Sequence, residues 1–117
     1  MKYILIVDDD ENILDLIELS LLREGVEIDK ARDGEEALKK SKEKHYDIIL
    51  LDLMMPKMDG RSACQEIRKM FDIPILILSA KNEKNKYLLN SQLRVNEYIN
   101  KPFDPEQLSK TVSRYLN

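Results

Sequence analysis

The chain has 117 residues, of which 43% are hydrophobic and 35% charged, and its formal net charge is -3. This length suits one domain with a real core, predicted to span 1–117, and the acidic balance gives no reason to expect nucleic-acid binding. No apolar run approaches the roughly 20 residues of a membrane span, and the start lacks a signal-peptide cleavage site. The single cysteine, Cys64, excludes an internal disulfide and suits a cytoplasmic protein.

Short β-rich runs alternate with helical patterns along the whole chain. Strands are expected at 2–7, 26–31, 47–52, 73–78 and 96–100. A helical pattern follows each strand, the fourth at roughly 83–93, and there is no repeat or linker. Strict alternation predicts an α/β fold: a doubly wound parallel sheet with right-handed crossovers and five helices on its two faces.

Capping residues mark where the helices begin and end. Asp10 is well placed to cap the first helix, and Asp33, with Glu36 three residues on, opens the second. The sequence Asp-Pro-Glu-Gln at 104–107 is a strong start signal for the last helix. Gly25 is expected to end the first helix.

Helical periodicity predicts which side chains face the core. Cys64, on the third helix, is expected to be a core or boundary thiol rather than a nucleophile. The expected inward residues, helix by helix, are Ile13, Leu16, Ile17, Ser20 and Leu21; Ala37, Leu38 and Ser41; Ala63, Ile67 and Met70; Leu88, Leu89 and Leu93; and Leu108, Thr111, Val112, Tyr115 and Leu116.

Polar side chains end four of the five predicted strands. Four apolar residues at 48–51 lead to Asp52, a carboxylate that is costly to bury without a compensating group. In open parallel sheets the functional site lies outside the carboxyl ends of the strands. The other residues at these ends are Asp8, Asp9, Ser79 and Lys101.

These residue types suit phosphoryl transfer to Asp52. Converging carboxylates repel one another, and a hard divalent cation with oxygen preference, Mg²⁺, removes that cost. Lys101 supplies a positive charge for Asp52 or a phosphoryl oxygen, and Ser79 a hydroxyl donor. An ionised carboxylate is already nucleophilic and needs no base. The only histidine, His45, is expected at the end of the second helix, far from these strand ends.

Each residue alone also has a simpler interpretation. Asp8 and Asp9 can be loop carboxylates that cap the first helix, and capping is the favoured role of Asp10. Lys101 alone would be a solvated lysine, and Ser79 a turn hydroxyl. The combination at the right strand ends is what favours a phosphoryl-transfer site.

Four motifs resemble the signatures of response-regulator receiver domains, in order and over essentially the whole chain. They are Ile-Val-Asp8-Asp9-Asp10, Leu-Asp52-Leu-Met-Met-Pro56-x-x-Asp59-Gly60, Leu-Ser79-Ala80-Lys81 and Tyr98-Ile-Asn-Lys101-Pro102-Phe103. The resemblance implies a flavodoxin-like fold with strand order 2-1-3-4-5. It also implies that a sensor histidine kinase or a histidine phosphotransfer protein phosphorylates the chain.

The resemblance assigns a role to each site residue. Asp52 would be the phosphoacceptor. Asp9, Asp52 and the carbonyl of Met54 would bind Mg²⁺, with Asp8 acting largely through water. Lys101 and Ser79 would contact the phosphoryl group, and the Lys101–Pro102 peptide would be cis.

Tyr98 matches the aromatic switch of such domains. Ser79 would move toward the phosphoryl group and Tyr98 would turn inward, which changes the face of the fourth helix, fifth strand and fifth helix for partners or for a homodimer. The alternative is a strand tyrosine packed at an edge.

The chain departs from the pattern at four positions. Arg94-Val95 stands where the family usually has Gly-Ala, so the turn before the fifth strand is expected to differ. Ser79 replaces the commoner threonine and keeps the hydroxyl. Met54 is apolar and cannot position a water, which predicts slow self-dephosphorylation.

Two other functions and two contexts stay open at the sequence level. A Mg²⁺ phosphohydrolase of the haloacid-dehalogenase kind would use Asp8 and Asp10 as nucleophile and acid, and leaves Asp52 unexplained. A purely structural receiver-like domain would not need the acid set. The domain either precedes an effector domain in a longer regulator or acts alone as a shuttle in a relay.

Overall fold

The structure, a computed structural model, describes residues 1–53, 60–80 and 94–116. Within these ranges a helix follows the first, second, third and fifth strands, as the periodicity predicted. The helix expected at 83–93, with its inward Leu88, Leu89 and Leu93, lies outside the described residues. The elements are β1 (Lys2–Val7), α1 (Glu11–Leu21), β2 (Val26–Ala31), α2 (Gly34–Glu43), β3 (Ile48–Asp52), α3 (Gly60–Met70), β4 (Ile75–Ala80), β5 (Glu97–Lys101) and α5 (Pro105–Leu116).

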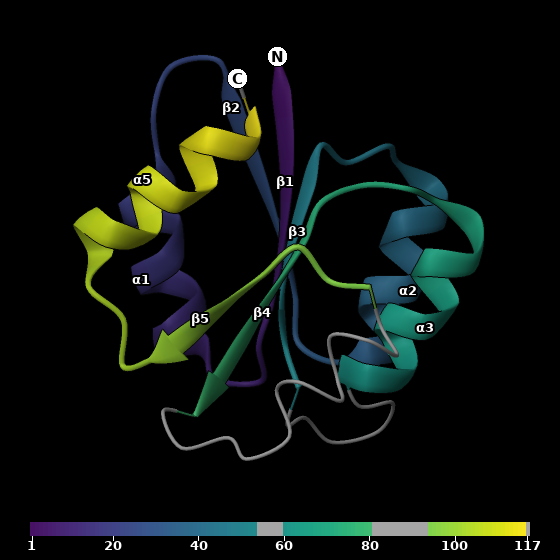
Figure 1. The fold of residues 1–117 in the computed structure, drawn as a ribbon. Helices are drawn as coiled ribbons and strands as arrows, with labels where there is room; N and C mark the ends of the chain where they lie inside the picture. The colour runs from purple at the N-terminus through teal and green to yellow at the C-terminus, as the bar shows by residue number, and fades with distance from the viewer. Residues whose placement is uncertain (54–59, 81–93, 117) are drawn as a thin grey trace.

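The five strands form one parallel sheet in the order β2-β1-β3-β4-β5, which confirms the predicted topology. All carboxyl ends therefore lie along one edge, at the bottom of Figure 1. Three strands begin later than predicted, β3 at Ile48, β4 at Ile75 and β5 at Glu97. Pro74 lies just outside β4, where its carbonyl accepts a hydrogen bond from the Ile49 amide at 3.0 Å.

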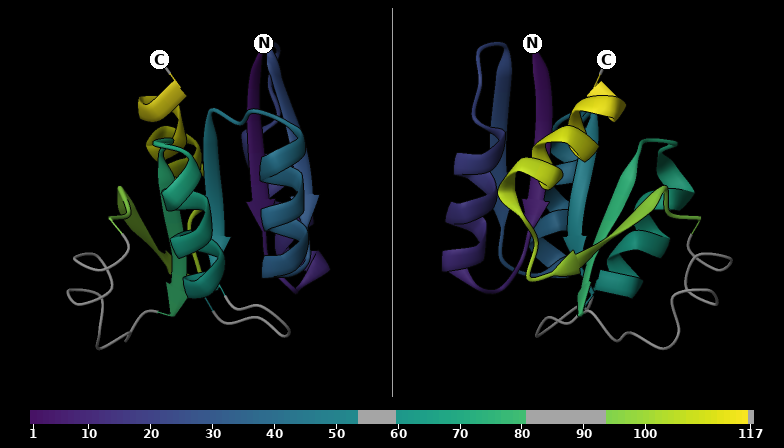
Figure 2. Two further views of the ribbon diagram at one scale, coloured as in Figure 1. Left: turned by 90° about the vertical axis from the view of Figure 1, so that its right-hand side faces the viewer. Right: turned by 60° about the vertical axis from the view of Figure 1, so that its left-hand side comes forward.

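Helices cover both faces of the sheet, as the doubly wound arrangement requires. Figures 1 and 2 show α1 and α5 on one face and α2 and α3 on the other. Alternate residues of the central strands enter the two cores: Leu50 packs with the α1 and α5 side, and Ile49 and Leu51 with the α2 and α3 side. β3 is buried throughout, which explains its continuous apolar run.

The predicted helix starts are confirmed by the capping contacts. The Asp10 carboxylate accepts a hydrogen bond from the Asn12 amide at 2.9 Å, and Asp33 accepts from the Glu36 amide at 2.8 Å. At α5, the Asp104 carbonyl accepts from the Leu108 amide at 2.9 Å. These caps fix where α1, α2 and α5 leave the sheet edge.

The predicted inner face of α1 is wrong at one position and incomplete at another. Leu14, Ile17 and Leu21 are buried, whereas Leu16 is 39% exposed. Apolar residues occur all round this helix, so periodicity alone does not fix its rotation. Packing against α5 does: Leu14, Ile17 and Leu21 share a core with that helix.

Met70 was expected inside and is exposed. The inner face of α3 is instead formed by Ala63, Cys64 and Ile67, and Cys64 is fully buried as a core thiol, its pKa raised by burial to about 11. Met70 is the last residue of the helix, and the next residue, Phe71, packs on the core in its place.

The prediction that Gly25 ends α1 is wrong. The helix ends at Leu21, and Gly25 has a φ of 84° within a turn that the Val26 amide closes on the Arg23 carbonyl. Its left-handed conformation serves the entry to β2 rather than a helix cap. In the described part of the chain, no helix combines the length and the apolar character that crossing a membrane requires.

Candidate functional site

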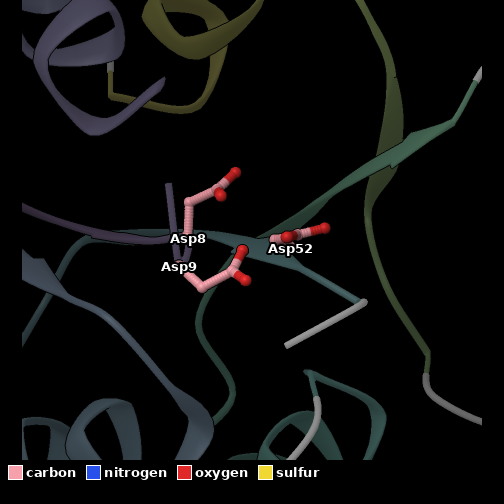
Figure 3. A group of neighbouring side chains, drawn as sticks. All are labelled: Asp8, Asp9 and Asp52. Carbon is pink, nitrogen blue, oxygen red and sulfur yellow. The ribbon is translucent and has the colours of Figure 1, made fainter. Parts of the chain in front are cut away.

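Three carboxylates meet where β1 and β3 end side by side. β1 pairs with β3 up to Val7 and Leu51, so the residues that follow, Asp8 and Asp52, lie next to each other. Oxygen atoms of Asp8, Asp9 and Asp52 all lie within 4.8 Å of one another, and Figure 3 shows the three side chains around a common space. This is also the point where the sheet's connections reverse direction, the expected location of a site in such folds.

The three acids differ in their surroundings. Asp8 is fully buried and Asp52 is 6% exposed, whereas Asp9 is exposed to solvent. One oxygen of Asp8 accepts a hydrogen bond from the Asp10 amide at 3.0 Å. Asp8 is therefore fixed by its own loop, and Asp9 stays accessible to a ligand from solution.

Lys101 completes the cluster from β5. Its Nζ lies 2.7 Å from Asp8 Oδ2 and 3.4 Å from Asp52 Oδ2. Burial alone would lower the pKa of this ammonium, but the two carboxylates outweigh burial and raise the pKa above its ordinary value. The ion pair with Asp52, one of the two partners that the sequence had left open for Lys101, is confirmed, and the shorter contact is with Asp8. The Lys101–Pro102 peptide is cis, as expected.

Ser79 contributes a hydroxyl from the end of β4. It is 4% exposed, and its Oγ has no hydrogen-bond partner among the described residues. Asp52 pairs with Leu78 in the β3–β4 ladder, so Ser79 lies one residue beyond the partner of Asp52. A buried polar atom without a partner is costly, which indicates a site built for a further oxygen-bearing group.

Charge balance favours a divalent cation in this space. Each pair of carboxylates at about 5 Å costs roughly 3 kcal/mol at an effective dielectric near 20. Three carboxylates and one ammonium leave two negative charges in excess, which one Mg²⁺ would neutralise. Clustered carboxylate oxygens with an accessible Asp9 are donors that Mg²⁺ prefers. The Met54 carbonyl, predicted as a further ligand, lies outside the described residues.

Gly60, at the start of α3, is a residue whose role the sequence did not explain. A Cβ built on it would lie 2.7 Å from Leu53 Cα and 2.8 Å from the Asp52 carbonyl carbon, and closer still to the Asp52 carbonyl oxygen. Its amide donates to the Leu53 carbonyl at 3.1 Å. Only glycine lets α3 approach the backbone of Asp52 this closely. The sequence signal for this close approach was the glycine itself, because the chain has just three glycines.

The remaining predicted residues lie as follows. Tyr98 is half-buried on β5 and packs against the core on the α2 and α3 side. Arg94 has a φ of 53° although it is not glycine. His45 is exposed and follows the cap of α2, Lys44.

Comparisons with known proteins identify the family. Residues 4–113 match the family model of the response regulator receiver domain. The chain belongs to the response-regulator receiver domain family. Such domains are the phosphoacceptors of two-component signalling, whose partners are histidine kinases, as the resemblance had implied.

Curated relatives are longer than this chain. It is 41% identical over 116 residues to the alkaline phosphatase synthesis transcriptional regulatory protein PhoP of Bacillus subtilis (strain 168). It is 40% identical over 113 residues to the probable transcriptional regulator ycf27 of Porphyridium aerugineum. The alignments cover 98% and 97% of this chain but 48% and 47% of the relatives. The chain thus spans about half the length of these proteins.

Solved receiver-like structures share the whole fold. A two-component response regulator from Clostridium difficile superposes with a TM-score of 0.91 at 30% identity, covering 99% of this chain and 96% of the other. The chemotaxis protein CheY4 of Vibrio cholerae superposes with a TM-score of 0.87 at 32% identity, covering 98% of each chain. These neighbours agree with the flavodoxin-like topology found here.

Replacing Ser79 with alanine should leave the stability almost unchanged and slow phosphorylation. In the unphosphorylated protein the substitution removes a buried hydroxyl that has no partner in the described structure, so the free energy of unfolding should change by less than about 1 kcal/mol. Phosphorylation is expected to slow, because the resemblance to receiver domains implies that this hydroxyl contacts the phosphoryl group. Urea denaturation and phosphorylation rates measure the two effects, and Ser79→Thr, which keeps the hydroxyl, is the control. A loss of several kcal/mol would show that the hydroxyl has a structural role instead.

Proposed function

We propose that Asp52 is the phosphoacceptor of this receiver domain and that it reacts in a Mg²⁺-dependent step. The observation that carries the proposal is the surroundings of the nearly buried Asp52 carboxylate. At the edge of the sheet where the strands end, it lies with two further acids, a lysine and a hydroxyl without a hydrogen-bond partner among the described residues. No other described group of three or more metal-ligating side chains gathers in this way.

The chemistry follows from the roles of these side chains. A carboxylate oxygen of Asp52 attacks the phosphorus of a phosphohistidine; the P–O bond forms while the P–N bond breaks, and the imidazole leaves with the electron pair and takes up a proton. Bound Mg²⁺ would supply positive charge to the transferred oxygens. Lys101 offsets a further negative charge, and Ser79 donates a hydrogen bond to one of the oxygens.

Asp8, Asp9 and Asp52 would hold Mg²⁺ in this arrangement, with Met54 contributing its carbonyl. Asp9 is the most accessible of the three acids, and Asp8 is already committed to Lys101 and the Asp10 amide. Those commitments support an indirect role for Asp8, through water. They also weigh against Asp8 as the nucleophile of a phosphohydrolase, as does the cap that occupies Asp10.

The donor would be a sensor histidine kinase or a histidine phosphotransfer protein. Transfer would draw Ser79 toward the phosphoryl group and turn Tyr98, which changes the face formed by β5, α5 and the expected helix at 83–93. That face would control an effector domain in a longer parent protein or support a homodimer. The length of the curated relatives and their names as transcriptional regulators support the effector-domain arrangement. We also propose a cytoplasmic location.

Incubation with acetyl phosphate and Mg²⁺ tests the proposal. The wild type should gain one phosphoryl group by intact mass, and Asp52→Ala should gain none while keeping its circular dichroism spectrum. Chelation of Mg²⁺ should suppress the gain in the wild type. Full modification of Asp52→Ala would refute Asp52 as the acceptor.

Met54→Asn should shorten the lifetime of the acyl phosphate. Met54, two residues beyond Asp52, is apolar, whereas an asparagine amide can hold a water against the phosphorus. We expect the wild type to lose its phosphoryl group slowly and the variant several-fold faster, measured as the decay of the modified mass. Met54→Leu, which stays apolar, is the control, and equal lifetimes in all three proteins would contradict the prediction.

A further inference from the structure

The guanidinium of Arg68, on the last turns of α3, uses all five of its N–H donors within the described structure. Nε and Nη2 donate to the Arg94 carbonyl at 3.1 and 2.9 Å. Nη1 donates to the carbonyls of Phe71 and Ile73 at 3.4 and 2.6 Å, and Nη2 also donates to Asn96 Oδ1 at 3.1 Å. One side chain thus joins α3, the α3–β4 loop and the residues that lead into β5.

Arg94 lies at the most unusual backbone position of this group. Its φ of 53° is in the left-handed region, which residues with a side chain rarely adopt and glycine adopts freely. Two of the five donors converge on its carbonyl. The guanidinium fork therefore holds the carbonyl in the direction that the left-handed turn requires.

Asn96 extends the same contacts into the sheet. The side-chain oxygen of Asn96 accepts a hydrogen bond from the backbone amide of Ile75 at 3.0 Å. The backbone amide of Asn96 donates to the Ile75 carbonyl at 2.9 Å. The β4–β5 ladder starts one residue later, at Leu76 and Glu97, and ends at Ala80 and Lys101. The alignment of Asn96 with Ile75 therefore sets which residue of β5 reaches the site.

β5 needs such an anchor because it is the edge strand of the sheet, paired with β4 alone. A slip of one residue would move Lys101 by about 3.3 Å and turn its side chain to the opposite face. The chain enters β5 beside α3 in Figure 1, at the end of the strand farthest from Lys101.

We propose that Arg68 is a positioning residue: it holds Arg94 in the left-handed conformation that glycine would adopt unaided, and so fixes the β5 register that places Lys101 beside Asp8. Measurements of stability and of hydrogen exchange test this proposal independently of the proposed function. The labelling measurement rests on it.

A double-mutant cycle in thermal unfolding tests the first part. Arg68→Ala should lower the melting temperature by roughly 10 °C. Lys69→Ala, which removes the 70% exposed cation next along the same helix, should change it by less than about 2 °C. Arg94→Gly should raise the melting temperature by a few degrees. In the Arg94→Gly background, Arg68→Ala should lower the melting temperature by roughly half as much as in the wild type. Equal losses in both backgrounds, or a loss no larger than that of Lys69→Ala, would overturn the proposal.

Two measurements well below every melting temperature test the second part. In Arg68→Ala the amides of β5 should exchange with solvent at least tenfold faster, and labelling of Asp52 by acetyl phosphate should slow several-fold, with Arg94→Gly restoring part of both. If Arg68→Ala shows the same exchange and labelling rates as the wild type, the positioning role is refuted. If the wild type itself is not labelled, the proposed function fails, and the exchange rates still decide the role of Arg68.

Discussion

Lys101→Met should tighten Mg²⁺ binding roughly tenfold and, at the same time, slow phosphorylation of Asp52 roughly 100-fold. The ammonium neutralises Asp8 and Asp52, from which it lies 2.7 and 3.4 Å. It therefore competes with the cation for the same carboxylates. The same ammonium would offset charge on the transferred phosphoryl group, and that contribution is lost in the variant.

The metal-free stability of Lys101→Met should fall by about 2 kcal/mol, because the variant leaves buried acids without their counter-charge. The folded-state pKa of Lys101 is raised above the ordinary 10.5. The contribution of Lys101 to the free energy of unfolding is therefore fully present below pH 10.5, and it is lost as the pH rises through the folded-state pKa. The difference between wild type and variant should be constant near neutral pH and should shrink only in strong alkali.

Isothermal titration with Mg²⁺, urea denaturation and acetyl phosphate labelling measure the three quantities for Lys101→Met. Lys101→Arg, which keeps the positive charge, is the control and should not tighten Mg²⁺ binding. A variant that binds Mg²⁺ more weakly would show that Lys101 organises the acids for the metal rather than competing with it.

Gly60→Ala should lower the free energy of unfolding by about 3 kcal/mol, a large effect for one methyl group. The added Cβ would meet the backbone of Asp52 and Leu53, neither of which is the flexible end of a side chain. The start of α3 or the end of β3 must shift to make room. Since that end carries Asp52, labelling of the folded fraction should slow as well.

Gly25→Ala is the matched control for this prediction. Gly25 has a φ of 84°, so alanine there pays a conformational cost of about 1 kcal/mol, but its Cβ would meet nothing within 4 Å. Urea denaturation should therefore rank Gly60→Ala well below Gly25→Ala, and only Gly60→Ala should slow labelling. The reverse order would contradict the close approach of α3 to Asp52.

Local and periodic signals in the sequence were enough for the alternating α/β architecture and for the residues at the strand ends, whereas the strand order came from the resemblance to receiver domains. Asp10 and Asp33 are caps because a carboxylate before a helical pattern satisfies amides close in sequence. Asp8, Asp52, Ser79 and Lys101 converge because parallel strands align their ends. These inferences need no knowledge of how helices pack.

The features that were predicted wrongly, or not predicted at all, depend on contacts between distant segments. The rotation of α1, which exposes Leu16 and buries Leu14, is set by packing against α5. The preference of Lys101 for Asp8 over Asp52 depends on fractions of an ångström between strand ends. Arg68 reaches 26 residues along the chain to Arg94, and nothing in the local sequence of α3 marks it as different from a surface arginine.

Locating the phosphoryl group on the intact chain tests the central claim most directly. The protein is labelled with acetyl phosphate and Mg²⁺, the acyl phosphate is reduced with borohydride, and the peptides are sequenced by mass spectrometry. Modification at Asp52 alone, lost when Mg²⁺ is chelated, is the predicted result. Modification at Asp8, or labelling that is indifferent to Mg²⁺, would contradict the account.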